Sequence, residues 1–390
     1  MRRRHKALFV TIVPSPYQRD LFAALAARND VDLSVCYMEA AAPDSPWPEK
    51  SLRSFERIMP GFWVPVGGAR GHVNWRLPDL AEPDVVVLSS LTSLTGQLLM
   101  RGGLRGKRWL FWGERLRQNS GVKDVIQRSL VAPISRASGV VGIGRAAEQD
   151  YRRRFPSLPH FCIPYHCDLS GFFAIHRRPR ANAPITFFFC GQMIQRKGVD
   201  LLLLAFDRLI RQGNDARLLL VGRDADLLKF LATVTSETRS RIRYEGFQPP
   251  ERLPEYFSQG DVFVLPSRYD GWGVVINQAL AAGLPIITSD AVGAGVDFVE
   301  SGINGMSVSA NDAKALHRAM EAFTKNPDVG RQWGWNSREK ARGLTPEAGA
   351  EKWVRVFDRI CRGGDMASGQ FWLHGSESRK SPSSNVVYDP

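Results

Sequence analysis

Two polar side chains within residues 262–290 flank a helix start whose backbone N–H groups could bind an anionic ligand. Asp270 precedes a glycine-rich turn, and Gln278 lies eight positions later. The first backbone N–H groups of a helix favour an anion such as a diphosphate, because they are free donors at its positive end. Gly271 and Gly273 let a ligand approach the backbone closely. The pattern therefore predicts a diphosphate site.

The residues around this pair predict a strand, a loop, a helix and a second strand. Residues 262–265 form a short apolar run typical of a buried parallel strand. Residues 274–282 predict a helix that Gly283 ends, and residues 284–288 predict the next strand. The loop therefore lies at the carboxyl end of a strand, where open α/β sheets bind ligands.

A second loop supplies two adjacent cations. Residues 185–190 predict the strand that opens the second sheet, the sheet that also carries the Asp270 loop, and residues 199–210 predict a helix. Arg196 and Lys197 lie on the glycine-bounded loop between them. Two cations at a helix start suit a departing diphosphate, because they neutralise the charge that develops on it. A solvated surface turn is the alternative for these two residues alone.

Together these motifs resemble the signature of family-4 retaining glycosyltransferases, the glycosyl transferases group 1. The family has two acidic residues eight positions apart, where this chain has Asp270 and the amide Gln278. Gln278 can accept and donate hydrogen bonds to a ribose, but it carries no charge. The positions that match the family are Trp272, Gly273, Ala279, Gly283 and Pro285.

The resemblance implies an α/β GT-B architecture, in which two Rossmann-like domains with parallel sheets face a central cleft. The second domain would hold a UDP-, GDP- or ADP-sugar, and family members retain anomeric configuration without a metal or another cofactor. Asp270 and the backbone N–H groups of Trp272 and Gly273 would hold the sugar. The donor-binding residues that the resemblance implies are Arg196, Lys197, Gly222, Phe247, Trp272, Gly273, Val274 and Gln278.

Glu114 is the acidic residue at the end of a strand predicted over residues 109–112. In the family, the corresponding strand end carries a His or an acid that points at the reacting sugar, so the resemblance implies a catalytic role for Glu114 beside Asp270. A surface ion pair with Arg115 or Arg117 is the alternative.

Three further motifs have simpler interpretations. Asp224 and Asp226 form the D-x-D pattern of metal-dependent glycosyltransferases, but a helix cap explains the first of them. Residues 142–147 match a dinucleotide fingerprint, G-x-G-x-x-A, without the acidic residue about 20 positions later that would bind a ribose. We interpret them as a late strand and a helix start. His166 is expected to be structural, because the other ligands of a metal site are missing.

The predicted domains follow from the order of these elements. Residues 1–175 form an acceptor-binding domain, residues 176–184 a charged linker, and residues 185–345 the nucleotide-sugar domain. Residues 40–80 show no clear period and are interpreted as an insertion or an acceptor-side loop. Residues 346–362 predict a helix that crosses back to the first domain. Residues 363–390 are rich in Gly and Ser and predict a disordered tail.

Charge is distributed unevenly along the 390 residues, whose net charge is +13. Residues 1–180 hold 27 Lys and Arg against 15 Asp and Glu, whereas residues 181–390 hold 25 against 24. A basic first half suits an anionic partner, such as an anionic membrane surface or an acidic polymer. Nucleic acid is not expected, because no aromatic stacking motif is interleaved with the charges.

An amphipathic helix is predicted over residues 122–137, with Val122, Val125 and Ile126 alternating with polar side chains. It could lie on anionic headgroups or cover the sheet, and Pro133 would kink it. No apolar run is long enough to span a bilayer, so we expect any membrane contact to be peripheral. Five scattered cysteines favour a reducing cytoplasm.

The function implied by the resemblance is transfer of a hexose or N-acetylhexosamine to a lipid-linked or surface-glycan acceptor at the cytoplasmic face of a membrane. Such a step belongs to polysaccharide or lipopolysaccharide biosynthesis. Two alternatives remain open. A nucleotide-sugar 2-epimerase has the same fold and needs no acceptor. A non-catalytic nucleotide-sugar-binding module would explain the amide Gln278 in place of an acid.

Overall fold

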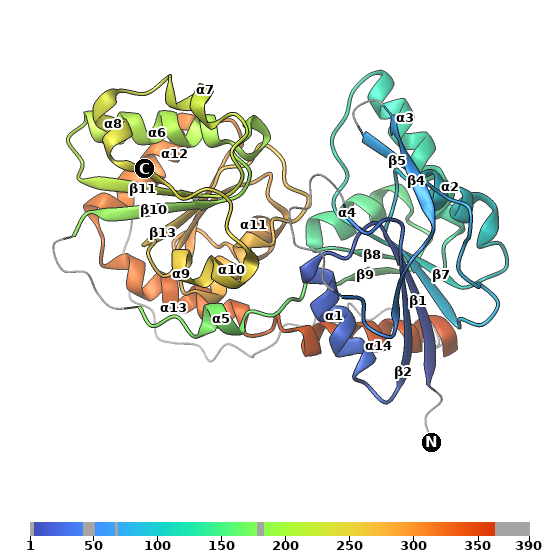
Figure 1. Cartoon of the computed structure of the whole chain (residues 1–390). Coiled ribbons are helices and arrows are strands. Elements are labelled where there is room, and N and C mark those ends of the chain that lie inside the picture. The colour runs from blue at the N-terminus through green and yellow to red at the C-terminus, as the bar shows by residue number, and fades with distance from the viewer. Residues whose placement is uncertain (1–3, 42–50, 67–68, 178–182, 363–390) are drawn as a thin grey trace.

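The computed structural model describes residues 4–41, 51–66, 69–177 and 183–362. Two parallel sheets, one of seven strands and one of six, form the centres of two domains with helices around each sheet (Figure 1). The predicted pair of parallel α/β domains is therefore confirmed. Residues 363–390, for which the sequence predicts a disordered tail, lie outside the described residues, as does most of the predicted linker.

The strands of the first sheet pair in parallel, and those over residues 85–88 and 109–113 are apolar runs. Ala7 pairs with Val85, and His5 pairs with Val31. Strands of this kind are buried on both faces and therefore need no polar alternation. In pairing order the strands are β3 (Glu56–Ile58), β2 (Val31–Tyr37), β1 (His5–Thr11), β6 (Val85–Leu88), β7 (Trp109–Gly113), β8 (Gly139–Gly142) and β9 (His160–Cys162).

The helices of the first half connect its strands. The second helix is short and continues as a π-helical turn, Leu99–Gly103. The predicted kink at Pro133 is a 3-10 segment, Ala132–Arg136. The helices are α1 (Pro16–Ala26), α2 (Leu94–Leu98), α3 (Val122–Val131), α4 (Arg145–Arg154) and α5 (Ser170–Phe173).

Residues 40–80 are more regular than the sequence predicts. β3 adds to the edge of the first sheet, and β4 (Gly61–Val66) pairs with β5 (Ala69–Asn74) as an antiparallel hairpin. The sequence predicts no strand here, because it shows no clear period, and this is wrong for β3, β4 and β5. Pro65 and several glycines hide the strand pattern, but a two-stranded hairpin outside the main sheet tolerates them, because fewer ladder bonds are required.

The second sheet begins at the predicted strand Ile185–Cys190 and contains the predicted strand Val262–Leu265 unchanged. These two strands are neighbours, with Phe187 paired with Val262. In pairing order the strands are β12 (Ile242–Tyr244), β11 (Ala216–Val221), β10 (Ile185–Cys190), β13 (Val262–Leu265), β14 (Ile286–Ser289) and β15 (Gly305–Val308).

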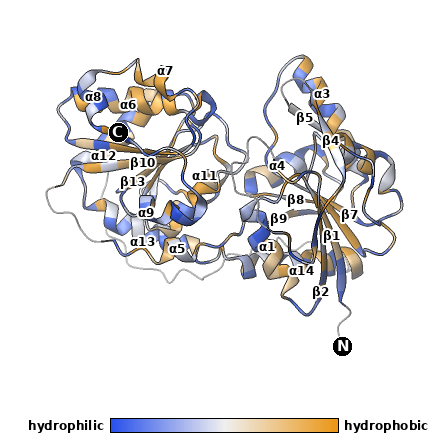
Figure 2. Ribbon diagram, viewed as in Figure 1, coloured by the Kyte–Doolittle hydropathy of each residue, from blue (hydrophilic) through white to orange (hydrophobic). Residues whose placement is uncertain are grey.

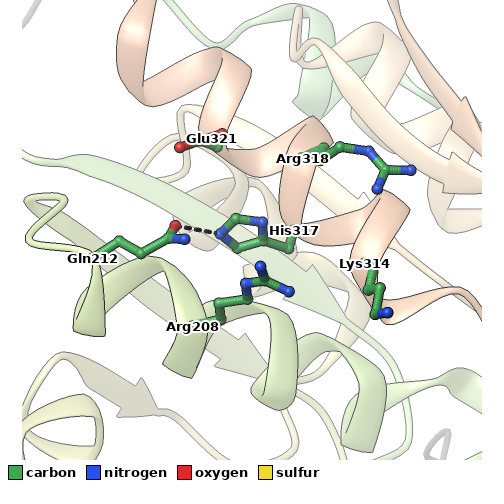
Figure 3. Close-up of a pocket in the computed structure, with 6 residues that line it drawn as sticks. All are labelled: Arg208, Gln212, Lys314, His317, Arg318 and Glu321. Carbon is green, nitrogen blue, oxygen red and sulfur yellow. Dashed lines mark hydrogen bonds between the residues drawn. The ribbon is translucent and has the colours of Figure 1, made fainter.

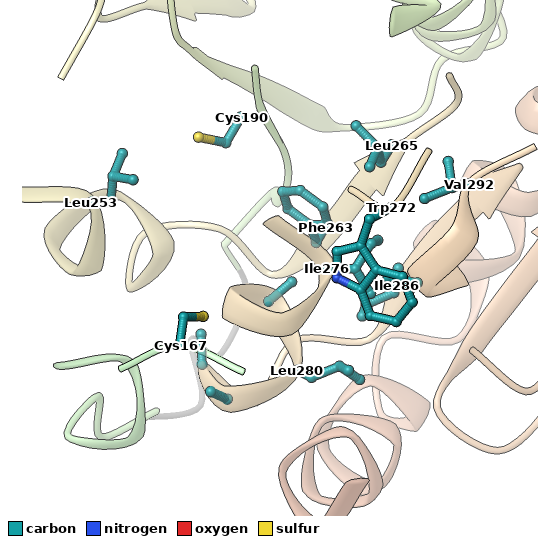
Figure 4. Packing of buried hydrophobic residues seen from close by; sticks show 14 of the residues in the cluster. Cys167, Cys190, Leu253, Phe263, Leu265, Trp272, Ile276, Leu280, Ile286 and Val292 are labelled. Carbon is teal, nitrogen blue, oxygen red and sulfur yellow. The ribbon is translucent and has the colours of Figure 1, made fainter. Parts of the chain in front are cut away.

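Helices pack on both sides of the second sheet, and the sequence does not predict α11 or α13. A glycine-rich start hides α11, and Gly and Trp interrupt the pattern of α13. Figure 4 shows apolar side chains from the strands packed against α10 and Trp272. The helices are α6 (Val199–Arg211), α7 (Leu227–Leu231), α8 (Ser236–Ser240), α9 (Leu253–Phe257), α10 (Val275–Ala281), α11 (Gly293–Phe298), α12 (Ala313–Lys325) and α13 (Val329–Ala341).

The last helix, α14 (Pro346–Arg362), lies against the first domain. His5 Nε2 is 2.9 Å from Asp358 Oδ1. Trp353 is fully buried and makes edge contacts with Phe9 and Trp112, at ring-centroid distances of 5.1 and 5.4 Å. The chain therefore crosses between the domains twice. Within the described ranges, each helix is too short or too polar to span a bilayer.

The two domains meet where the start of α4 contacts α11 and the loop before α10, and we call this region the domain junction. Arg145 N donates to Asp297 Oδ2 at 2.9 Å, and its guanidinium donates to Asp297 O at 2.7 Å. Gly144 has φ +88°, and a Cβ at this position would collide with the ring of Trp272. The G-x-G-x-x-A motif is a late strand and a helix start, as predicted, and it serves the contact between domains.

We expect Gly144→Ala to destabilise the protein by about 1–3 kcal/mol more than Gly106→Ala, because it adds a collision to the cost of a positive φ. Gly106 is the matched control, since it has φ +76° and nothing within 4 Å of its missing Cβ. Urea unfolding followed by tryptophan fluorescence measures both variants. Equal losses of stability would contradict the packing of Trp272 against Gly144.

Candidate functional site

The predicted cation and the predicted carboxylate come together at one edge of the second sheet. Lys197 ends the 3-10 turn Gln195–Lys197 after β10, and Asp270 lies in the loop after the neighbouring strand β13. Their side chains form an ion pair and are only 15% and 11% exposed. Because adjacent parallel strands end at the same edge, the two loops necessarily meet there.

The neighbouring arginines hold the two loops against each other. Arg196 Nη1 donates to Tyr269 O at 3.2 Å, and Arg196 O accepts from Arg268 N at 2.8 Å. The guanidinium of Arg268 makes two bonds of 2.7 Å to Asp200 on α6. Arg196 and Lys197 therefore face the Asp270 segment, and the loops are fixed before any ligand binds.

The loop around Asp270 is held from its other side by the start of α11. Asp270 N donates to Ala291 O at 3.1 Å, and Gly293 N donates to Asp270 O at 3.2 Å. Gly273 has φ +85°, a conformation that favours glycine and turns the chain into α10. Among the described residues, the backbone N–H groups of Trp272, Gly273 and Val274 have no hydrogen-bond acceptor. They remain available to a ligand.

Glu114 reaches this loop from the other domain. It follows β7, and a side chain at position 271 would collide with its carboxylate. Atoms of both domains surround the Glu114 carboxylate and displace water from it, although part of the side chain still reaches solvent. This burial raises the pKa of Glu114 to about 7, aided by the Asp270 carboxylate and opposed by Lys197 and a hydrogen bond from Tyr165. Glu114 can therefore exchange a proton near neutral pH.

The surface ion pairs proposed as the alternative for Glu114 are not formed among the described residues. Arg115 Nη1 donates to Asp290 O at 3.4 Å, and the guanidinium of Arg117 lies 5.1 Å from the ring centroid of Tyr269. Both arginines therefore turn to the second domain, and neither neutralises Glu114.

Gln278 is buried on α10, with 4% of its surface exposed. It is hydrogen-bonded to Tyr17, which lies in the loop and first turn after β1. Its Oε1 has no partner among the described residues, so the amide nitrogen is the group that meets Tyr17. Burial raises the pKa of Tyr17, which keeps its hydroxyl neutral. Gln278, at the position of the family's second acid, therefore has an unpaired amide oxygen and contacts Tyr17 of the other domain.

The remaining predicted donor residues differ in their surroundings. Gly222 has φ +140°, and a Cβ there would collide with the backbone of Gly191, so it allows two strand ends to approach. Phe247 is 42% exposed beyond the end of β12. The ring of Trp272 is 1% exposed and lies in the domain junction, 6.4 Å from the Tyr165 ring. Only its backbone can therefore serve a ligand.

Sequence reasoning missed the tyrosines that connect the domains. Tyr165 is hydrogen-bonded to Glu114, and its carbonyl accepts from Asn277 Nδ2 at 2.9 Å. Tyr17 contacts Gln278, as described above. The Pro-x-x-x-Asp segment from Pro164 to Asp168 indicates the crossing between domains, but no pattern shows that Tyr165 points at Glu114.

The motifs set aside earlier are structural in this chain. Asp224 Oδ1 accepts from Leu227 N at 3.3 Å, at the start of α7, as predicted. His166 is fully buried, and its Nδ1 lies 2.7 Å from Pro164 O. Burial lowers the pKa of His166 to about 3. In the described ranges, no group of three or more His, Cys, Asp or Glu side chains is placed to hold a metal ion.

A separate cavity of about 290 Å³ lies between α6 and α12 (Figure 3). His317 is buried in its wall and bonds to Gln212 Oε1 at 2.7 Å. None of its lining residues belongs to the predicted donor set. They are Arg208, Gln212, Lys314, His317, Arg318 and Glu321.

Residues 173–340 match the family model Glycosyl transferases group 1. The second domain matches this family model, so the predicted resemblance is confirmed for that part of the chain. The lipopolysaccharide core biosynthesis mannosyltransferase LpcC of Rhizobium leguminosarum bv. viciae is 28% identical over 212 residues, 50% of this chain and 58% of its own. In the first curated relatives the match spans 32%, 46% and 38% of their length. The chain thus spans about a third to a half of these relatives.

Two solved structures resemble nearly the whole chain. Sucrose-phosphate synthase from Thermosynechococcus elongatus has a TM-score of 0.70 at 21% identity, covering 93% of this chain and 100% of that chain. Anabaena Alr3699/HepE in complex with UDP has a TM-score of 0.68 at 14% identity, covering 90% and 99%. At these identities the likeness shows the fold, and it confirms the predicted GT-B architecture.

We expect Lys197→Met to destabilise the protein by about 1–3 kcal/mol, because it leaves the buried Asp270 carboxylate unpaired. The double variant Lys197→Met with Asp270→Asn should recover most of this loss. Thermal and urea unfolding of the two single variants and the double variant measure the coupling. Lys229→Met, at an exposed position on α7, is the control and should change stability little. Additive effects at positions 197 and 270 would contradict the ion pair.

Proposed function

We propose that this protein transfers a hexose or N-acetylhexosamine from a nucleoside diphosphate sugar to an acceptor held by the basic first domain, with retention of configuration. The observation that supports this most strongly is the fixed group of Lys197, Arg196 and Asp270 at the carboxyl edge of the second sheet. The family membership of the second domain supports the same donor class.

The diphosphate is proposed to lie between the cationic turn and the start of α10. Lys197 and Arg196 neutralise the negative charge that develops on the diphosphate as its bond to the sugar breaks. This stabilisation lowers the barrier to transfer. The free N–H groups of Trp272, Gly273 and Val274 supply additional donors. When Lys197 binds the diphosphate, it releases its ion pair with Asp270. The Asp270 carboxylate can then accept a hydrogen bond from a sugar hydroxyl.

The acceptor is proposed to enter from the side of Glu114. The carboxylate of Glu114 comes from the first domain and lies against Gly271 of the second, so it is near both substrates. As a carboxylate it accepts the proton of the attacking hydroxyl. Tyr165 keeps it in place by a hydrogen bond.

A lipid-linked or surface-glycan acceptor at the cytoplasmic face of a membrane fits the charge of the first half of the chain. The name of the relative from Rhizobium leguminosarum, which refers to lipopolysaccharide core biosynthesis, supports the same class of acceptor. We therefore place the reaction in surface polysaccharide or lipopolysaccharide assembly.

A panel of UDP-, GDP- and ADP-sugars should raise the melting temperature for one nucleotide, because a ligand that binds the folded state stabilises it by mass action. Lys197→Ala should weaken donor binding about tenfold or more, since it removes a charge-assisted contact to the diphosphate. The matched control Lys229→Ala should bind the donor normally. A protein that binds and hydrolyses no nucleotide sugar, and is unchanged by Lys197→Ala, contradicts the proposal.

Product analysis separates the two alternatives. An epimerase converts the nucleotide sugar without an acceptor, whereas a transferase releases the nucleoside diphosphate in proportion to glycosylated product. A binding module binds donor and forms no product with any acceptor. In that case, activity gained by Gln278→Glu would show that the amide is what disables the site.

We expect kcat/KM to rise with pH through about 7, because Glu114 is protonated below its raised pKa and accepts a proton only above it. Glu114→Gln should lose this inflection and lower kcat/KM by about 10²–10⁴-fold. Glu237→Gln on α8, at an exposed position, is the control and should keep both the rate and the inflection. An unchanged pH profile in Glu114→Gln would remove Glu114 from the reaction.

A further inference from the structure

The first domain exposes a group of large apolar side chains that the proposed donor site does not use. They lie on β4, after β5, on α2 and on α3, and each is between 45% and 74% exposed. We call this group the apolar surface. Its members are Phe62, Trp63, Trp75, Leu94, Leu98, Val122, Val125 and Ile126.

Hydrogen bonds join the elements that carry the apolar surface. Asn74 N donates to Thr95 Oγ1 at 2.9 Å, which connects β5 to α2. Gln97 Nε2 donates to Leu130 O at 3.0 Å, which connects α2 to α3. Figure 1 shows β4, β5, α2 and α3 grouped at one end of the first domain. The apolar side chains therefore belong to one region rather than to scattered positions.

The helix α3 does not cover the sheet, although the sequence allows that alternative. Val122, Val125 and Ile126 are 74%, 65% and 54% exposed, and of its residues only Val131 is buried. Figure 2 shows hydrophobic residues along this helix. A contiguous exposed apolar stripe marks an interaction surface, so we expect a partner or a membrane to cover this face of α3.

Cations accompany the apolar side chains. Arg76, next to Trp75, is exposed, and residues 71–77 contain no acidic residue. On α3, Lys123 is exposed and the acidic Asp124 pairs with Arg128. Two copies packed through this face in a symmetric dimer would bring like charges together. An anionic lipid surface instead satisfies both features, since aliphatic and tryptophan side chains enter the headgroup region while cations meet the phosphates.

The apolar surface is continuous with the proposed acceptor side. Residues 114–121 connect Glu114 at the end of β7 directly to the start of α3. A chain bound to a bilayer through α3 therefore holds Glu114 near the headgroups. A sugar acceptor attached to a lipid would lie at the same level.

We propose that β4, the segment after β5, α2 and α3 form a docking surface for an anionic phospholipid bilayer, which presents the domain junction to a lipid-linked acceptor. The presentation of the acceptor rests on the proposed function, whereas the docking to a bilayer does not. The apolar side chains supply most of the binding and the cations supply the preference for anionic lipid.

Co-sedimentation with vesicles tests the docking. We expect the full chain to bind phosphatidylglycerol-containing vesicles and to leave them in part at high salt, with little binding to pure phosphatidylcholine. The double variant Val125→Ser with Ile126→Ser, and separately Trp63→Ser, should weaken binding about tenfold or more. The matched control replaces exposed apolar residues of the second domain, Leu204→Ser with Leu228→Ser, and should bind normally.

Melting temperatures of all variants, and the donor-induced shift measured without vesicles, separate this proposal from the proposed function. Lost vesicle binding with an intact donor shift supports docking. Three results overturn it: no binding of the wild-type chain to anionic vesicles, equal binding by the surface variants, or equal loss in the control. A concentration-dependent dimer in analytical ultracentrifugation that the surface variants abolish would also overturn it, because a second copy would then be the occupant.

Discussion

The ion pair between Lys197 and Asp270 is the interaction on which the rest of the site depends. A lysine or aspartate charge that is so little exposed would destabilise the fold without a partner. The two residues form a pair because the neighbouring strands β10 and β13 end at the same edge of the sheet. The bonds from Arg268 to Asp200 then fix the two loops in this arrangement. A pair of this kind gives the site a defined shape and keeps each member ready to exchange its partner for a charged ligand.

The first domain completes the site through side chains that approach from the opposite side. Glu114 lies against the turn after Asp270, and Tyr17 meets Gln278. In the family, an acid stands at position 278 and carries its own charge. Here an amide paired with a tyrosine stands at this position, so the side chain that we propose to bind the donor also contacts the other domain.

Much of the fold could be predicted from the sequence, because several of its strands, such as β6 and β13, are uninterrupted apolar runs. β13 has the predicted bounds, and the loop that carries Arg196 and Lys197 was expected at the same sheet edge as Asp270. The hairpin of β4 and β5 could not be predicted, since glycine and proline hide its alternation. The contacts of Tyr17 and Tyr165 could not be predicted either, because they depend on how two domains meet, which no local pattern records.

The return of α14 to the first domain makes the two halves inseparable as folding units. Trp353 fills a space beside Phe9 and Trp112, which both lie more than two hundred residues earlier in the chain. A fragment cut before Pro346 would leave these rings uncovered. The halves therefore cannot be exchanged between relatives as simple modules, and synthesis of the last helix must finish before the first domain has its complete core.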